Sequence, residues 1–177
     1  MVVVVYGGSA CGKSAFAEKT AMELSGEKRV YIATMRITDE ECVHRVERHR
    51  AMRAQKGFST VEAPRDLAEV VLREVPAGST ILLECLGNLT ANELYDPAGA
   101  GENAASAILE GLDQLAGQCV HLIVVSNEVF SGGADYAGDT GRYLKALAQV
   151  NNALAARADH VVRVVCGIPV YYKGVEK

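Results

Sequence analysis

The sequence has no excess of positive charge and no long apolar run. Its 177 residues include 18 Lys and Arg against 22 Asp and Glu, a formal net charge of −4, so the basic surface typical of a nucleic-acid-binding protein is lacking. No apolar run approaches the roughly 18 residues that a membrane-spanning helix needs. The amino-terminal valines have no basic residues before them and meet glycine at once, so we expect no signal peptide.

The sequence also lacks a paired cysteine motif. Five cysteines are present, an odd number, and none forms a C-x-x-C pair: Cys11, Cys42, Cys85, Cys119 and Cys166. Scattered cysteines of this kind favour isolated thiols in a reducing compartment, and we expect a cytoplasmic protein.

What the sequence does contain is a regular alternation of strand-like and helix-like segments. Hydrophobic residues make up 49% of the chain, enough for the core of a single domain over 1–177. Unbroken apolar runs, typical of strands buried on both faces, occupy residues 2–6, 30–33, 80–83, 121–125 and 161–165. Helical patterns occupy residues 13–24, 39–53, 65–74, 104–116 and 140–158. This order predicts a three-layer α/β fold with a mostly parallel sheet. A last strand near 169–173 follows a tight connection and is expected to be an antiparallel edge strand.

Residues 7–14 read GGSACGKS and fit the phosphate-loop pattern G-x-x-x-x-G-K-[ST] between a strand and a helix. Glycines allow successive backbone N–H groups to point at one phosphate, and the helix adds its positive N-terminus. Lys13 would reach the β- and γ-phosphates, and Ser14 would bind Mg²⁺. The alternative is a glycine turn with a surface lysine, but the strand–loop–helix context favours nucleotide binding. The predicted phosphate-loop residues are Gly7, Gly8, Ser9, Ala10, Cys11, Gly12, Lys13 and Ser14.

Two acidic residues could complete the metal site. Glu84 closes an apolar strand, where an unpaired carboxylate would be costly, and Glu128 follows another strand. We prefer Glu84, directly or through water, because a capping or structural role explains Glu128 equally well.

The segment 39–50 opens with acids and closes with bases, which suits a helix dipole. Arg45 and His49 share a face, so this end of the helix could meet a phosphate. A solvated basic helix end is the simpler interpretation. Cys42, His44 and His49 could also be taken as metal ligands, although their spacing matches no recognised site.

Eight segments follow one another along the chain: GGSACGKS, YIATM, DEE…RVERHR, TVEAP, ILLECL, VVSNEV, VNNALAARAD and VVCGIPV. This series resembles the adenosylcobinamide kinase / adenosylcobinamide-phosphate guanylyltransferase family over nearly the whole chain. The resemblance implies a P-loop NTPase-type fold, use of ATP, GTP and Mg²⁺, a corrinoid substrate and a homotrimer. It also implies two reactions of cobalamin biosynthesis: phosphorylation of adenosylcobinamide, then transfer of GMP from GTP to the resulting phosphate.

The resemblance also assigns residues. His49 matches the histidine that carries GMP as a covalent intermediate, and a neutral imidazole is a suitable nucleophile. Glu84 matches the acid after the central strand. The segments that line the GTP site are matched by Ala33, Thr34, Met35, Arg50, Ala51, Met52, Arg53 and Glu62.

This chain departs from the family pattern mainly in loops. Ala10 and Cys11 replace the usual Arg-Ser of the phosphate loop, Arg53 is followed by Ala54, and residues 130–135 differ from the usual continuation. We expect much of this variation to lie around the corrinoid rather than the GTP. Two rival interpretations are a small-metabolite kinase without guanylyl transfer and a non-catalytic nucleotide-binding relative.

Overall fold

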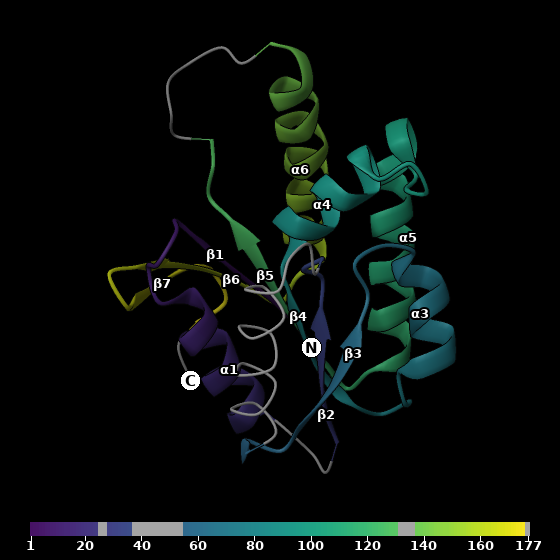
Figure 1. Ribbon diagram of the computed structural model, residues 1–177. Coiled ribbons are helices and arrows are strands. Elements are labelled where there is room, and N and C mark those ends of the chain that lie inside the picture. The colour runs from purple at the N-terminus through teal and green to yellow at the C-terminus, as the bar shows by residue number, and fades with distance from the viewer. Residues whose placement is uncertain (25–27, 37–54, 131–136, 176–177) are drawn as a thin grey trace.

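Seven strands form one sheet in the order β3-β2-β4-β5-β1-β6-β7 (Figure 1). The computed structural model describes residues 1–24, 28–36, 55–130 and 137–175. Each neighbouring pair is parallel except β6 and β7, which are antiparallel. The strands are β1 (Val2–Gly7), β2 (Arg29–Ala33), β3 (Phe58–Glu62), β4 (Thr80–Glu84), β5 (His121–Asn127), β6 (His160–Val165) and β7 (Ile168–Lys173).

Helices cover both faces of the sheet. They are α1 (Lys13–Glu23), α3 (Leu67–Glu74), α4 (Leu86–Tyr95), α5 (Ala104–Gln118) and α6 (Gly138–Arg157), with a short 3₁₀ turn η1 (Gly101–Asn103). Successive residues of a strand point to opposite faces, so each face has its own core. Val4 lies in the core shared with α3, α5 and α6, whereas Val3 and Val5 pack with Ala17 and Ala21 of α1.

The predicted α/β fold with a mostly parallel sheet and an antiparallel edge strand is confirmed. Two elements escaped prediction. Strand β3 (FSTVE) is an edge strand whose polar residues break the apolar run, and α4 (LGNLTANELY) is poor in strong helix formers. The helix predicted over 39–53 lies outside the described residues. None of the helices in the described ranges is long and apolar enough to cross a membrane.

The parallel topology positions the site. Strands β1, β2, β3, β4 and β5 all end at the same edge of the sheet, and ligands of such folds bind at that edge. The GGSACGKS segment leaves β1 at this edge, between β5 and β6.

Candidate active site

The loop between β1 and α1 turns tightly in front of the helix. Gly12 precedes the helix with a φ of 94°, a left-handed conformation that favours glycine. A Cβ added at Gly7 would lie 2.7 Å from both the Cys11 Sγ and the Val164 backbone oxygen. The Lys13 ammonium donates a hydrogen bond to the Gly8 carbonyl, with Nζ and O 3.0 Å apart. The lysine therefore folds back over its own loop, where the phosphates of a nucleotide would lie.

Neighbouring strands hold this loop in place. The Gly7 carbonyl accepts a hydrogen bond from the Glu128 N–H at 2.9 Å, just after β5. The Cys11 carbonyl accepts one from the Gly167 N–H at 2.8 Å, in the turn between β6 and β7. These two hydrogen bonds fix the loop from both sides.

The Ser14 hydroxyl lies against the carboxylate of Glu84. It donates a hydrogen bond to Oε1, and the Tyr31 hydroxyl donates to Oε2 at 3.1 Å. The structure therefore brings together the two residues predicted to hold Mg²⁺, although β5 separates β4, which ends at Glu84, from β1, which leads to Ser14. The contact of Tyr31 with Glu84 was not predicted from the sequence, because a tyrosine in an apolar strand gives no sign of its hydrogen-bond partner.

The chemistry of this pair fits magnesium. Mg²⁺ prefers oxygen ligands and binds through one or two protein groups together with substrate phosphates and water. Ser14 and Glu84 supply oxygens of this kind. Among the described residues no group of three or more His, Cys, Asp or Glu side chains could hold a metal alone, so a metal here would depend on bound phosphate.

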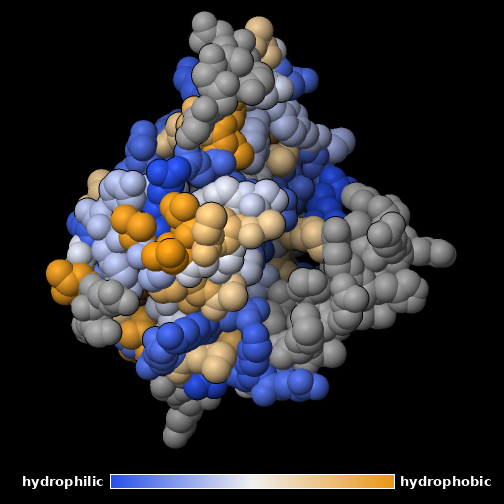
Figure 2. Space-filling view, turned by 90° about the vertical axis from the view of Figure 1, so that its left-hand side faces the viewer, coloured by the Kyte–Doolittle hydropathy of each residue, from blue (hydrophilic) through white to orange (hydrophobic). Residues whose placement is uncertain are grey.

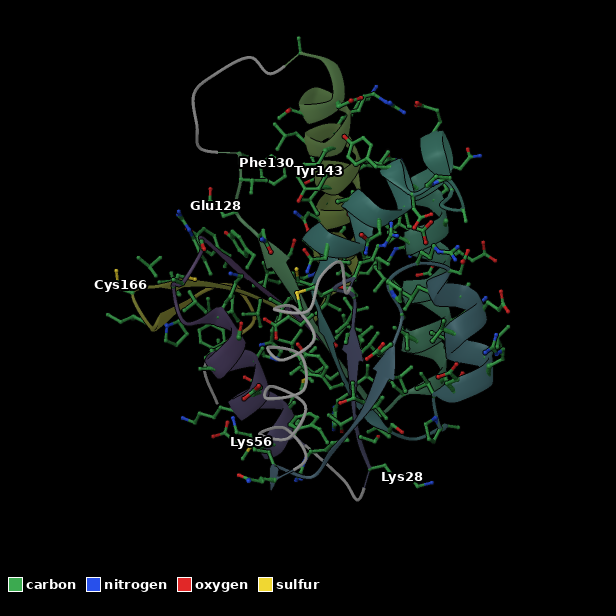
Figure 3. The ribbon with its side chains drawn as sticks, in the orientation of Figure 1. Lys28, Lys56, Glu128, Phe130, Tyr143 and Cys166 are labelled. Carbon is green, nitrogen blue, oxygen red and sulfur yellow. The ribbon has the colours of Figure 1, made fainter. Side chains whose placement is uncertain are left out.

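Glu128, the alternative acid, is engaged elsewhere. Its carboxylate forms an ion pair with Arg163 at 2.5 Å, and Figure 3 shows it just beyond the C-terminal end of β5. A hydrogen bond with Tyr172 and the charge of Glu128 raise the pKa of the Arg163 guanidinium. The geometry therefore favours Glu84 over Glu128 as the acid of the metal site.

Thr34 supports the backbone next to Glu84. Its buried hydroxyl accepts a hydrogen bond from the Cys85 N–H at 2.7 Å and donates to the Cys85 carbonyl at 2.8 Å. The side-chain amide of Asn92 donates to the carbonyls of Thr34 and Pro64, both at 2.8 Å. Sequence reasoning missed Asn92, whose only signal is an amide on a half-buried helix face.

The remaining predicted GTP-site residues divide into two groups. Ala33, Glu62 and Glu84 lie in one row across β2, β3 and β4, and Met35 follows β2 at the same edge. His49 lies outside the described residues, as do Arg50, Ala51, Met52 and Arg53. Their roles stay predictions.

Burial raises the pKa of the Cys85 thiol, which packs between Glu84 and the start of α4. The thiol is therefore protonated near neutral pH and packs at this edge of the sheet.

Tyr143 of α6 and Asn127 of β5 lie close to the first turn of α4. A Cβ added at Gly87 would lie 3.1 Å from the Tyr143 hydroxyl oxygen and 3.3 Å from the Asn127 Cγ.

Comparison with known proteins gives consistent matches. The sequence model of the cobinamide kinase / cobinamide phosphate guanyltransferase family matches residues 3–172. The bifunctional adenosylcobalamin biosynthesis protein CobP of Pseudomonas aeruginosa is 34% identical over 172 residues, covering 97% of this chain and 96% of the relative. The CobU protein of Escherichia coli K12, described by the same words, is 32% identical over 184 residues, covering 98% and 100%.

A solved structure, that of the RadB recombinase, shares the fold. It matches with a TM-score of 0.50 and 18% identity, over 92% of this chain and 73% of its own. At this identity the likeness extends to the fold alone.

Proposed function

The chain belongs to the cobinamide kinase / cobinamide phosphate guanyltransferase family of bifunctional enzymes, and from this premise we propose that it catalyses both reactions on an adenosylcobinamide substrate. The first is transfer of the γ-phosphoryl group of ATP or GTP to the side-chain hydroxyl of adenosylcobinamide. The second is transfer of GMP from GTP to adenosylcobinamide phosphate, which gives adenosylcobinamide-GDP and pyrophosphate.

The contact between Ser14 and Glu84 beside Lys13 is the observation that carries the kinase proposal. Phosphoryl transfer depends mainly on positioning and on cations that offset the charge of the γ-phosphate and its leaving group. Lys13 provides one such cation. Ser14 and Glu84 would hold Mg²⁺, which neutralises charge on the β- and γ-phosphates when it is bound.

GMP transfer is proposed to proceed through His49. An imidazole nitrogen would attack the α-phosphorus of GTP, forming a nitrogen–phosphorus bond as pyrophosphate leaves. The phosphate of the corrinoid would then displace the histidine. Support comes from the RVERHR segment, in which His49 lies beside Arg48 and Arg50. We propose that the guanosine of GTP is bound by residues of two segments and one strand end: Ala33, Thr34 and Met35, then Arg50, Ala51, Met52 and Arg53, and Glu62.

We further propose that the enzyme is a cytoplasmic homotrimer. An apolar surface on the hairpin of β6 and β7 supports self-association: Ile168 is 65% exposed, Val170 44% and Val165 44%. Figure 2 shows apolar side chains gathered on this face of the molecule. Monomeric proteins rarely expose a contiguous apolar patch without a binding role.

Labelled GTP tests the proposal directly. With label on the α-phosphate, the protein should acquire an acid-labile, base-stable adduct that adenosylcobinamide phosphate removes. With label on the γ-phosphate, adenosylcobinamide should become labelled instead. A simple kinase would give only the second result, and a non-catalytic nucleotide-binding relative would give neither.

A further inference from the structure

A groove of about 790 Å³ runs along α1 on the side of the β6–β7 hairpin. The end next to the phosphate loop is lined by Gly12, Ala15, Phe16, Gly167, Pro169 and Tyr171. We propose that this groove holds the base and ribose of the nucleotide that donates the phosphoryl group. The inference rests on the proposed kinase function and adds a nucleoside site to it.

The groove opens directly from the phosphate loop. A Cβ added at Gly12 would lie 3.2 Å from the Gly167 Cα, and the Gly167 N–H donates to the Cys11 carbonyl. The floor of the loop and the end of the groove are therefore one continuous surface. A ligand bound by its phosphates at Gly12 can enter the groove without crossing a gap.

The direction of the nucleotide follows from the metal side of the loop. The β- and γ-phosphates of the donor would lie beside Ser14 and Glu84. Because the nucleoside is attached through the α-phosphate, it would extend from the loop in the direction away from Glu84. At 3.6 residues per turn, Ser14 and Phe16 project from α1 about 200° apart. Figure 1 shows β4 on one side of α1 and the β6–β7 hairpin on the other. The nucleoside therefore extends toward the side of α1 that carries Phe16, and the groove lies on that side.

The lining suits a base and a ribose. Phe16, Pro169 and Tyr171 form apolar walls, while Lys19 and Glu23 bring charged groups along the same side of α1. The Tyr171 ring meets His160 edge-on, with centroids 6.4 Å apart, which fixes its orientation. Small-molecule sites commonly measure roughly 300–1,000 Å³ and combine apolar walls with a few polar groups.

This groove is separate from the proposed guanosine site, which includes Ala33 and Glu62. Those residues end β2 and β3, and three strands, β4, β5 and β1, separate β2 from β6. The two reactions would thus use separate nucleoside positions on opposite sides of α1, each with its own orientation of the triphosphate. The position at Tyr171 would serve phosphoryl transfer, and the position at Glu62 would serve GMP transfer.

Tyr171 and Tyr172 offer a matched pair for the test. Tyr171 lines the groove, whereas Tyr172 points to the opposite face, with its ring 6.1 Å from that of Tyr6. Binding of ATP, GTP and inorganic tripolyphosphate, each with Mg²⁺, would be measured by calorimetry. Because base stacking on an aromatic ring strengthens binding by about tenfold or more, Tyr171→Ala should weaken binding of ATP by that factor. GTP, which also has the position at Glu62, should lose less. Binding of tripolyphosphate, which has no base, should not change.

Three controls make the result decisive. Tyr171→Phe should restore nucleotide binding, and Tyr172→Ala should behave as the wild type. Ala15→Leu, on the exposed surface of α1, adds bulk at the groove without removing a packed side chain, so it should weaken binding of the nucleotide but not of tripolyphosphate. Unchanged binding of ATP in Tyr171→Ala and Ala15→Leu, or an equal loss of tripolyphosphate binding, would overturn the proposed groove site. Failure of the kinase proposal looks different: the wild type would bind nucleotide through the groove but would not phosphorylate adenosylcobinamide.

Discussion

The Ser14 hydroxyl donates a hydrogen bond to the Glu84 carboxylate across 70 residues of sequence. One residue lies in the first turn of the helix after the phosphate loop, and the other ends β4, two places away from β1 in the sheet. The parallel arrangement makes the contact possible because it brings the ends of β1 and β4 to one edge. In the proposed function this pair marks the metal side of the site, and from it we infer the direction of the bound nucleotide.

Replacing Glu84 by glutamine should lower the turnover of the kinase more than its affinity for nucleotide. Glutamine keeps the shape of the side chain and can still form hydrogen bonds with Ser14 and Tyr31, but it removes the negative charge that we propose organises the metal. Loss of one such electrostatic contact costs about 10²-fold or more in rate. Steady-state kinetics with varied Mg²⁺ would measure the effect.

Glu128→Gln is the matched control, because this carboxylate pairs with Arg163 instead. Its kinase turnover should stay within a few-fold of the wild type. If the two variants lose activity equally, or if Glu128→Gln loses more, the metal assignment to Glu84 is wrong.

Sequence alone could single out the phosphate-loop segment and Glu84 because their signals are local. The GGSACGKS segment matches a contiguous motif, and an acid that ends an apolar strand is conspicuous. The supporting contacts were beyond prediction because they depend on strand register. Tyr31 reaches Glu84 only because β2 lies beside β4, and Thr34 binds Cys85 for the same reason. Asn92 belongs to α4, a helix with too weak a pattern to be recognised.

Gly7→Ala should destabilise the protein through a steric clash. The added Cβ would lie 2.7 Å from the Cys11 Sγ, which can move, and 2.7 Å from the Val164 backbone oxygen, which is held in β6. Overpacking of this kind lowers the free energy of unfolding by about 1–3 kcal/mol. Urea denaturation without nucleotide would measure the change.

Gly8→Ala provides the comparison in the same loop. A Cβ there would meet no atom of the described residues within 4 Å, so the free energy of unfolding should change by about 0.5 kcal/mol or less. Equal stabilities for Gly7→Ala and Gly8→Ala would show that the loop does not pack against β6 as described.

Alkylation of Cys85 should require unusually high pH. Burial disfavours the thiolate and raises the thiol pKa, so the reactive form accumulates only above the usual midpoint of about 8.5. Mass spectrometry of iodoacetamide-treated protein across a pH series would give the rate at each cysteine. Cys166, which is exposed at the tip of the hairpin, should react before Cys85 (Figure 3). A Cys85 midpoint at or below 8.5 would contradict the buried environment.

The sharpest test of the two-reaction proposal is His49→Ala. This histidine lies beside Arg48 and Arg50 and shares a predicted helical face with Arg45, so these positive charges would attract a phosphate and disfavour the imidazolium form. The substitution should abolish both the GMP adduct and GMP transfer. It should leave at least part of the cobinamide kinase activity, because that reaction needs only the phosphate loop, the metal and the acceptor.

His44→Ala tests whether the effect belongs to one position or to the basic segment as a whole. His44 lies outside the RVERHR sequence but on the same predicted helix, so a general disturbance of that helix would affect both variants alike. We expect His44→Ala to retain the adduct and both activities. An adduct that persists in His49→Ala, or a wild type that never forms one, would remove the guanylyltransferase step and leave a kinase, because Ser14 and Glu84 do not depend on either histidine.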